Sequence, residues 1–523
     1  MKRRDFLSQS GKAMTVAALA GSARGVNMSA LASSPVMSAM QKLVQDTDRV
    51  MVLIQLTGGN DGLNTVIPVD DARYYNARKN IAIPKAKALK LRDGLSLHPV
   101  MTGFRDLFNE GRLSIVQNVT YPNPDRSHFR GTDIWLTATD ADVFKSTGWL
   151  GRYLQTLAPQ FPQVMPTEPL AIQIGEALSL GFKADKGSLG ITFRDPDAFY
   201  SLVDQNTNSA YDAAPATIGG AELDYVRSVE KASQVYSKTV KAAADRVKTN
   251  KVVYPQSNGL ARSLQIVSRL IAGGLSTKMY LVSISGSSYD THFNQGGENG
   301  VHAQLLSDLS EAVTLFLNDC KQLGTAHRVA GLTFSEFGRR VAENGSQGTD
   351  HGTAAPLFVF GENIIGGRIH GRNPDLVNLD SRGDLLMEYD YRQIYAASLL
   401  QWFGTNNDVM TQTLFREFSP LPLFQEAATD VESDVDTPAQ PMECYPRPCS
   451  DRAFVKYIVP FQSDVTLTLL DLRGNTVGAM SEGTLQAGTH TSILQTSHLS
   501  SGTYFVRLRC GRYEHMSALH VQR

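Results

Sequence analysis

The sequence lacks an excess of either charge, has few cysteines and contains no long apolar run. It has 50 Lys and Arg against 51 Asp and Glu, a net charge of −1 over 523 residues. A near-neutral chain lacks the basic surface that nucleic acids need, so we expect no nucleic-acid partner. No run of about 18 apolar residues, the length of a membrane-spanning helix, occurs. The mature chain is therefore predicted to have no transmembrane segment.

The four cysteines have no paired spacing of the zinc-ribbon kind. Cys444 and Cys449 lie in the stretch CYPRPC, near enough in sequence to form a disulfide in an oxidising compartment. Two free thiols in a loop fit the same spacing equally well. With 42% hydrophobic and 19% charged residues, the composition is that of a globular protein. The length suits one large and one small domain.

Residues 1–34 have the features of an export signal. They begin MKRRDFL, continue through a weakly apolar stretch and end near the small residues of Ala30-Leu31-Ala32. The paired arginines before Phe-Leu resemble the twin-arginine pattern, which directs folded proteins to export. We therefore predict an exported protein that reaches the periplasm and then the cell surface or the medium, with the export machinery as a partner.

The composition changes near Gln425. Residues 425–452 are rich in Asp, Glu, Pro and Ser, which predicts a linker. Short alternating runs then follow, separated by Gly, Asn and Ser turns. They predict a small all-β, immunoglobulin-like sandwich over 453–523. The expected strands are 465–470, 490–493, 504–508 and 518–521.

Between these ends, residues 46–424 alternate apolar strand runs with helical periodicity. This alternation predicts an α/β domain with a doubly wound, mostly parallel sheet that is covered by helices on both faces. Strands are expected at 50–56, 113–119, 278–285, 328–334 and 356–361, and helices at 128–136, 219–248, 257–273 and 301–322.

Polar residues that suit a metal site follow these strand runs. The carboxyl ends of parallel strands meet at one edge of a sheet, so these side chains are expected to converge. Carboxylates that share a crevice repel one another unless a cation neutralises them. Mixed Asp and His ligands suit zinc or manganese better than calcium. A single Asp at a strand end more often caps a helix, so the prediction rests on the whole group: Asp61, Ser127, Asp290, His292, Glu336, Asp350 and His351.

Seven motifs follow one another along residues 50–405: LIQLTGGNDGLNTVIP (53–68), LSLHP (95–99), RSHFRGTDIW (126–135), YDTHFNQ (289–295), LTFSEFGRR (332–340), TDHGTAAPLFVFG (349–361) and DYRQIYAASLLQWFG (390–404). Through these motifs the region resembles the exported bacterial family called domain of unknown function 1501, a branch of the alkaline phosphatase and sulfatase superfamily. Residues 453–523, with the order DLRGN, QAGTH and LSSGTYFVRL, resemble a type IX secretion sorting domain. An accessory immunoglobulin-like module is the alternative for this tail.

The resemblance implies an alkaline phosphatase-like fold and a site built around a divalent metal. Ser127 matches the superfamily's nucleophile at a helix N-terminus, where both the helix and a metal favour the alkoxide. His128 beside it is either a general base or a donor to an anion. The implied metal ligands are Asp61, Asp290, His292, Glu336 and His351.

Phe337 is the main departure from the superfamily pattern, because it stands where a histidine ligand is expected. A phenyl ring cannot bind a metal, so we expect it to point away from the centre into apolar packing. An alternative alignment places Asp350 and His351 on that motif and leaves the last histidine at His370. We favour the first alignment, since a strand precedes SEFG. One metal is better supported than two.

The predicted function is an exported metal-dependent hydrolase of phosphate-like esters, acting on a small anionic ester or a surface glycan. Sulfatases need a Cys or Ser in a Cys-x-Pro-x-Arg context, which the chain lacks. The alternative is a non-catalytic binding protein that keeps the hydrolase fold, with Phe337 as a sign of lost catalysis. The residues predicted to bind substrate are Asn60, Arg126, Arg130, Arg339 and Asp350.

Overall fold

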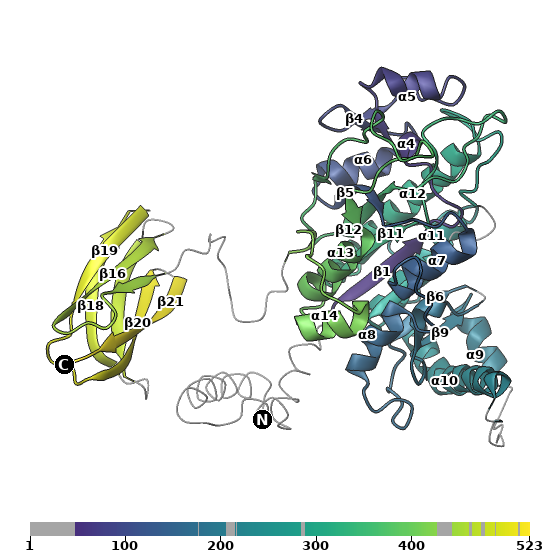
Figure 1. The fold of residues 1–523 in the computed structure, drawn as a ribbon. Helices are drawn as coiled ribbons and strands as arrows, with labels where there is room; N and C mark the ends of the chain where they lie inside the picture. Colours follow the sequence, from purple (N-terminus) through teal and green to yellow (C-terminus); the bar gives the residue numbers. More distant parts are fainter. Residues whose placement is uncertain are drawn as a thin grey trace. The chain divides into compact units, whose positions relative to one another are not determined.

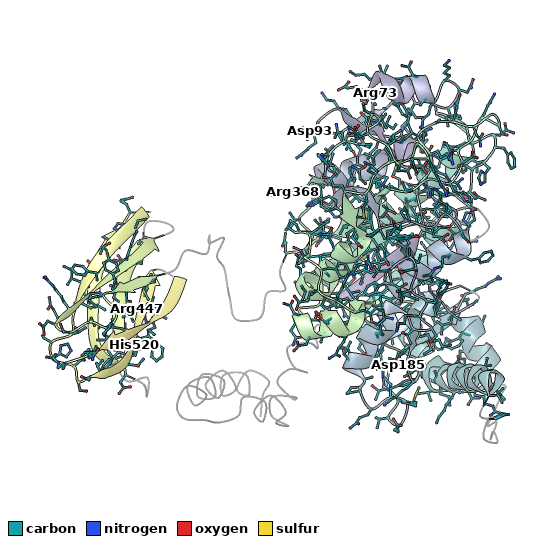
Figure 2. The ribbon with its side chains drawn as sticks, in the orientation of Figure 1. Arg73, Asp93, Asp185, Arg368, Arg447 and His520 are labelled. Carbon is teal, nitrogen blue, oxygen red and sulfur yellow. The ribbon has the colours of Figure 1, made fainter. Side chains whose placement is uncertain are left out.

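The computed structural model describes residues 48–175, 177–204, 215, 217–283, 288–425, 442–459, 463–471, 476–486, 488–510 and 513–523. The described residues fall into two compact units, one within Gln41–Ala427 and the other within Ala428–Arg523 (Figure 1). Each unit has its own hydrophobic core. Charged side chains such as Arg73, Asp93 and Asp185 are exposed on the large unit (Figure 2). The predicted signal over 1–34 lies outside the described residues.

A mixed sheet of nine described strands forms the centre of the large unit. The strand order is β13-β5-β12-β11-β1-β10-β6-β9, and β14 also pairs with β5. Alternate residues of β1 (Val50–Gln55) enter two different cores, Val52 one and Leu53 the other. Both faces are buried, which explains the continuous apolar run in the sequence. The other strands are β5 (Leu113–Thr120), β6 (Ala171–Ile174), β9 (Gly190–Phe193), β10 (Met279–Ser283), β11 (Val329–Phe334), β12 (Ala355–Gly361), β13 (Ile369–His370) and β14 (Tyr389–Asp390).

The strand directions bring distant parts of the chain to one edge of this sheet. β1 pairs in parallel with β10 and β11, and β6 continues in parallel with β10 and β9. β12 runs antiparallel to both β11 and β5, which makes β5 parallel to β1. The carboxyl ends of β1, β5, β10 and β11 and the amino end of β12 therefore share an edge. The expected parallel sheet is thus mixed, with β12 reversed inside it.

Helices cover both faces, as the alternating pattern predicted. One core contains residues of α6 (Thr102–Asn109), α9 (Pro196–Asp204), α10 (Ile218–Arg246), α11 (Gly259–Ala272) and α12 (Val301–Gln322). The other contains residues of α7 (His128–Thr137), α8 (Trp149–Leu157), α13 (Tyr391–Ala397) and α14 (Asn407–Leu414). In α11 the buried Leu260, Leu264, Val267 and Ile271 recur at three- and four-residue spacing, which places them on one face.

Shorter elements complete the large unit. A small sheet of β2 (Val66–Pro68), β4 (Leu95–Leu97) and β3 (Leu89–Lys90) lies with the short helices α4 (Gly62–Thr65) and α5 (Ala72–Ala77) between β1 and α6 in the chain. The remaining elements are β7 (Lys183–Ala184), β8 (Gly187–Ser188), η1 (Leu180–Phe182), η2 (Ala326–Arg328) and η3 (Ser398–Trp402). Among the residues described, no helix has the length and apolarity that crossing a membrane requires.

The small unit consists of two antiparallel sheets around one core, so the prediction of an all-β tail is confirmed. Alternate residues Val465, Leu467 and Leu469 point into that core. The immunoglobulin-like topology stays a prediction. One sheet has the order β15-β16-β19 and the other β18-β17-β20-β21. Their bounds are β15 (Glu443–Tyr445), β16 (Arg452–Val459), β17 (Ser463–Leu470), β18 (Thr476–Leu485), β19 (Gly488–Gln495), β20 (Gly502–Cys510) and β21 (Tyr513–Val521).

The first strand of this unit lies within the range predicted as a linker. β15 pairs with β16 although it lies within 425–452. Met442 and Cys444, two residues apart, enter the core despite the Pro-rich surroundings of this segment. Cys444 on β15 and Cys449 are both buried, and in the described part of the chain both are free thiols. The structure thus has the free-thiol form of the two arrangements that the spacing allowed.

Candidate metal centre

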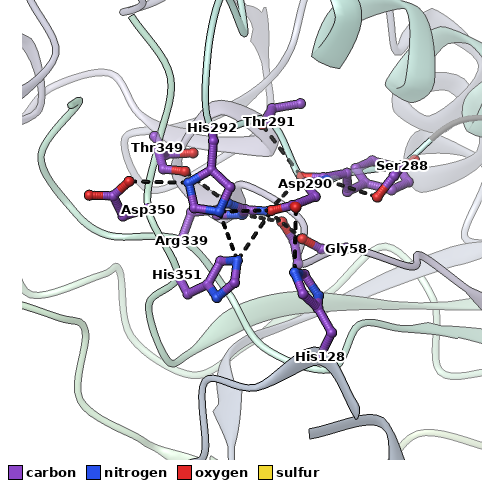
Figure 3. A network of polar contacts seen from close by, with 12 residues as sticks. Gly58, His128, Ser288, Asp290, Thr291, His292, Arg339, Thr349, Asp350 and His351 are labelled. Carbon is purple, nitrogen blue, oxygen red and sulfur yellow. Dashed lines mark hydrogen bonds and ion pairs between the residues drawn. The ribbon is translucent and has the colours of Figure 1, made fainter. Parts of the chain in front are cut away.

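Five polar side chains meet at the shared edge of the large sheet, and Figure 3 labels four of them, His128, Asp290, His292 and His351. His128 begins α7 after β5, Asp290 and His292 follow β10, Glu336 follows β11, and His351 precedes β12. Each lies in hydrogen-bond or ion-pair contact with another member of the group. The strand directions explain this convergence, because the antiparallel β12 brings in the residues that precede it, whereas the other strands bring in residues that follow them.

Three ligand-type atoms lie especially close together. His292 Nε2 is 2.9 Å from His351 Nε2 and 3.1 Å from Asp290 Oδ1. His351 Nε2 is 3.2 Å from the same carboxylate oxygen. His128 Nε2 approaches the other oxygen, Asp290 Oδ2, at 3.5 Å. Three imidazoles therefore surround one carboxylate.

The outer nitrogen of each imidazole fixes its tautomer. His292 Nδ1 lies 3.2 Å from Asp350 Oδ1, His351 Nδ1 2.8 Å from the Arg126 carbonyl, and His128 Nδ1 2.9 Å from Glu336 Oε1. These oxygens only accept hydrogen bonds, so each Nδ1 must carry the proton. In the neutral rings every Nε2 then presents a lone pair to Asp290. Burial lowers the pKa of His351, although its Arg126 and Asp290 contacts oppose the shift, which favours the neutral ring.

This donor set fits a divalent cation. Lone pairs and a carboxylate facing one another at about 3 Å repel unless a proton or a metal lies between them. Histidines that bind metals usually donate their other N–H to a carbonyl or carboxylate, as all three do here. His128, Asp290 and His351 offer ligand atoms that all lie within 4.8 Å of one another. Nitrogen ligands with a single carboxylate suit zinc, and manganese less well.

Arg339 holds the central carboxylate in place. Its Nη2 donates to Asp290 Oδ1 at 2.5 Å, and its other contacts are the carbonyls of Gly58, Gly59, Tyr289 and Thr349. Burial acts to raise the pKa of Asp290, but Arg339 outweighs it and leaves the pKa below its ordinary value. The side chain of Arg339 is fully buried, so its donors serve the fold and not the substrate that the sequence suggested.

Glu336 contacts His128 directly. Its Oε1 accepts from the Gly58 N–H at 2.7 Å and lies 2.9 Å from His128 Nδ1. This hydrogen bond is the main cause of the raised pKa of His128, since burial opposes it. Glu336 is 1% exposed, and its Oε2 has no hydrogen-bond partner among the described residues. A buried carboxylate oxygen without a partner beside this group adds to the need for positive charge.

Asp61, predicted as a ligand, has an internal partner instead. Its Oδ2 accepts from Arg78 Nη1 and Gln295 Nε2, both at 2.6 Å, and neither Asp61 nor Arg78 is exposed. Burial acts to raise the pKa of Asp61, and Arg78 more than offsets it, so the pKa is lowered. The neighbouring Asn60 is also buried, where its Oδ1 contacts His302 and Thr65. Nothing in the sequence marked Arg78 as a site residue, whereas Gln295 is the last residue of the motif YDTHFNQ.

Ser127 lies at the N-terminus of α7, as predicted. It is exposed, and its Oγ accepts from the Arg130 N–H at a long 3.5 Å. Arg130 itself donates to the carbonyls of Ala141 and Val143 and lies over the ring of Phe144.

The remaining predicted substrate residues are engaged within the protein. Arg126 forms ion pairs with Asp380 at 2.9 Å and with the buried Asp384. Asp350 contacts His292 and Asn344, and it is half exposed at the rim of the cluster. It therefore orients an imidazole.

The expectation for Phe337 is wrong. Its ring does not point away from the centre but packs on two of the imidazoles, with centroids 5.0 Å from His128 and 4.5 Å from His351. It is 2% exposed and also abuts Gly59. The two imidazole rings, tilted by 45° and 35° to the phenyl ring, supply part of its packing surface. His370, the alternative final ligand, lies on β13.

Two family descriptions match the chain. Residues 48–413 match "Protein of unknown function (DUF1501)", and residues 443–522 match "Secretion system C-terminal sorting domain". The second match begins at β15, which again places this strand with the tail. No curated protein matches the chain.

Several solved structures are similar at low identity. A sulfatase from Pseudoalteromonas sp. is 11% identical over 88% of each chain, with a TM-score of 0.32. A mutant of the alkaline phosphatase PafA is 11% identical over 56% of this chain and 64% of its own, with a TM-score of 0.27. The alkaline phosphatase from the Antarctic bacterium TAB5 is 11% identical over 62% and 94%, with a TM-score of 0.22. These scores are too low to support a function.

Proposed function

This chain belongs to the family described as "Protein of unknown function (DUF1501)", and we propose that it is an exported, metal-dependent hydrolase of phosphate-like esters. The observation that carries the proposal is the group of three histidines whose Nε2 atoms face a single carboxylate, Asp290, with every Nδ1 proton donated outwards. A structural role alone does not require this arrangement. The resemblance to alkaline phosphatases in the sequence motifs supports the same chemistry.

Asp290, His292 and His351 are the proposed ligands, because their three atoms lie closest together. Zinc is the proposed metal, with manganese as the alternative. Three protein ligands leave a coordination position open, as in catalytic zinc sites. The bound cation would supply the positive charge that draws electron density from the ester oxygen.

Ser127 remains the proposed nucleophile and His128 the proposed base. The Ser127 hydroxyl is exposed at a helix N-terminus, where the helix dipole favours developing negative charge. Glu336 holds His128 in the tautomer whose Nε2 can accept a proton. In this proposal Glu336 positions the base and is not a ligand, and Asp61 supports the fold through Arg78.

Metal content tests the ligand assignment. Purified protein with zinc supplied should contain about one equivalent by mass spectrometry. Asp290→Asn and His351→Ala should reduce it to background, because each removes a ligand. Asp61→Asn should keep the metal, since its partners are Arg78 and Gln295. His327→Ala, an exposed histidine of the same unit, is the matched control. Loss of zinc from folded Asp61→Asn together with its retention in Asp290→Asn would refute the assignment.

Turnover separates the enzyme from its non-catalytic alternative. The zinc-loaded protein should hydrolyse phosphate esters in a screen of monoesters and diesters. Ser127→Ala should abolish turnover but keep the zinc, because the hydroxyl lies outside the ligand set. A protein that holds zinc and hydrolyses none of these esters would instead support a surface binding protein.

Export through the twin-arginine route is part of the proposal. The sorting-domain match at 443–522 indicates a secreted or surface protein, and the motif MKRRDFL suits export in the folded, metal-loaded state. Replacing Arg3 and Arg4 together by lysine should leave the precursor in the cytoplasm, as cell fractionation would detect. Normal export of that variant would exclude this route.

A further inference from the structure

The arginines around the metal centre are already occupied by protein groups. Arg339 is fully buried against carbonyls and Asp290, and Arg126 is paired with Asp380 and Asp384. Arg130 donates to carbonyls of the loop after α7. Arg340 is 41% exposed, with Asp384 3.9 Å away. In the part of the chain that the structure describes, the centre therefore offers a substrate only the partly exposed Arg340 beyond the charge of a bound cation.

Negative charge lies at the same rim. Asp350 is half exposed, and its carboxylate accepts from Asn344 Nδ2 at 3.0 Å and lies 3.2 Å from His292 Nδ1. Asp290 is 35% exposed. A dianionic ester would meet these carboxylates, and the partly exposed Arg340 beside them already interacts with Asp350 and Asp384. A monoanion would suffer about half of the repulsion.

Two exposed phenylalanines directly follow cluster histidines in the sequence. His-Phe occurs twice in the sequence, at 128–129 and 292–293, and each time the histidine belongs to the cluster. Phe129 is 87% exposed and Phe293 69%. Exposed aromatic rings can contact a bound ligand, and these two directly follow cluster histidines in the sequence.

We infer that the site takes monoanionic esters that carry an aromatic or other flat apolar group, which Phe129 and Phe293 contact while the phosphoryl group faces His292 and His351. The inference rests on the proposed function and narrows its substrate class. Aromatic side chains bind such groups by stacking and by burying their apolar surface. The arginines are already paired and the exposed rings carry no charge. Both features disfavour a small dianion such as a simple phosphomonoester.

Calorimetric binding to the zinc-loaded full-length protein tests this, independently of turnover. Diphenyl phosphate, a monoanion with two rings, should bind about tenfold more tightly than dimethyl phosphate, a monoanion without rings. It should also bind more tightly than phenyl phosphate, which is close to dianionic at about pH 8. Phenyl phosphate binding more tightly than diphenyl phosphate would overturn the inference.

Variants test whether Phe129 and Phe293 are the rings that contact the aromatic group. The double variant Phe129→Ala, Phe293→Ala should reduce the diphenyl-to-dimethyl ratio towards one and leave dimethyl phosphate binding unchanged. Phe144→Ala is the matched control, because Phe144 is 76% exposed but lies over Arg130 and is not adjacent to a cluster histidine. An unchanged ratio in the double variant would refute the assignment. Absence of ester turnover refutes the proposed function alone, because the binding ratios do not depend on it.

Discussion

At the scale of single residues, the same residue type takes different roles according to its partner. Asp290 is 35% exposed and faced by three imidazoles, whereas Asp61 is buried and paired with Arg78. Both follow strands of the same sheet, and both were predicted as ligands. A buried ion pair whose partner is removed leaves an uncompensated charge, which is strongly destabilising. Both carboxylates have an arginine partner, Arg78 for Asp61 and Arg339 for Asp290, so it is the exposure of Asp290 and the three imidazoles around it that make it the ligand we propose.

His302 predicts a pH dependence of stability. It is fully buried, 3.0 Å from Asn60 Oδ1, and burial lowers its pKa to about 3. The unfolded chain takes up a proton below about pH 6.5, whereas the folded chain stays neutral until about pH 3, so stability falls as the pH falls through this window. This histidine should cost about 2 kcal/mol at pH 5 relative to pH 7.

Urea unfolding of the wild type and of His302→Gln at both pH values measures this cost. Tryptophan fluorescence reports the large unit, because all three tryptophans, Trp135, Trp149 and Trp402, lie in it. The difference in unfolding free energy between the wild type and His302→Gln should be smaller at pH 5 than at pH 7. Equal losses of stability in both would show that His302 is protonated in the folded state.

At the scale of elements, the turn after β1 sets the geometry of the centre. Gly58 has φ +112°, and a Cβ there would lie 2.2 Å from Ser288 Oγ and 2.5 Å from the Asp290 nitrogen. The Tyr289 N–H donates to the Thr57 carbonyl and ties the two loops together. The close approach of these backbones needs glycine, since a side chain would push the loop that carries Asp290 away.

Gly58→Ala adds only one methyl group, but it should nevertheless lower both the stability of the protein and its zinc content. We expect a loss of stability of about 1–3 kcal/mol from the strained backbone and a lower zinc content. Gly345→Ala is the control, because nothing lies within 4 Å of the Cβ that it would add. Thermal melting and metal analysis of both variants give the comparison. Full zinc content in Gly58→Ala would contradict this account of the turn.

At the scale of the whole molecule, the two units each bury their own core. The large unit buries apolar residues on both faces of its sheet, and the small unit buries a separate cluster between its two sheets. The stretch between them begins near Gln425, in a region of linker composition. Units with separate cores are expected to fold separately.

Truncation after Gln425 should leave the large unit folded. The urea midpoint that tryptophan fluorescence reports should match that of the full-length protein, and the zinc content should be unchanged, because every cluster residue precedes the cut. A lower midpoint would mean that the tail stabilises the large unit and that the two are not independent.

The sequence by itself determined the elements of this protein and the region of its site. A buried strand is recognised as a run of apolar residues, and an amphipathic helix as apolar residues spaced three and four apart. Both patterns are local in the sequence. Asp290 and His292 follow a strand and His351 precedes one, and these positions could be predicted from the sequence for the same reason. Only the tertiary structure determined which side chains contact one another. Glu336 meets His128 across 208 residues, and Asp61 meets Arg78 and Gln295.

The physical reason is that hydrogen bonds and ion pairs depend on strand order and direction, which periodicity does not encode. The reversed β12 brings His351 to the edge where β5 ends, and the packing there places Phe337 against two tilted imidazole rings rather than in an apolar core. Which groups surround each carboxylate was thus decided by contacts between segments far apart in the chain.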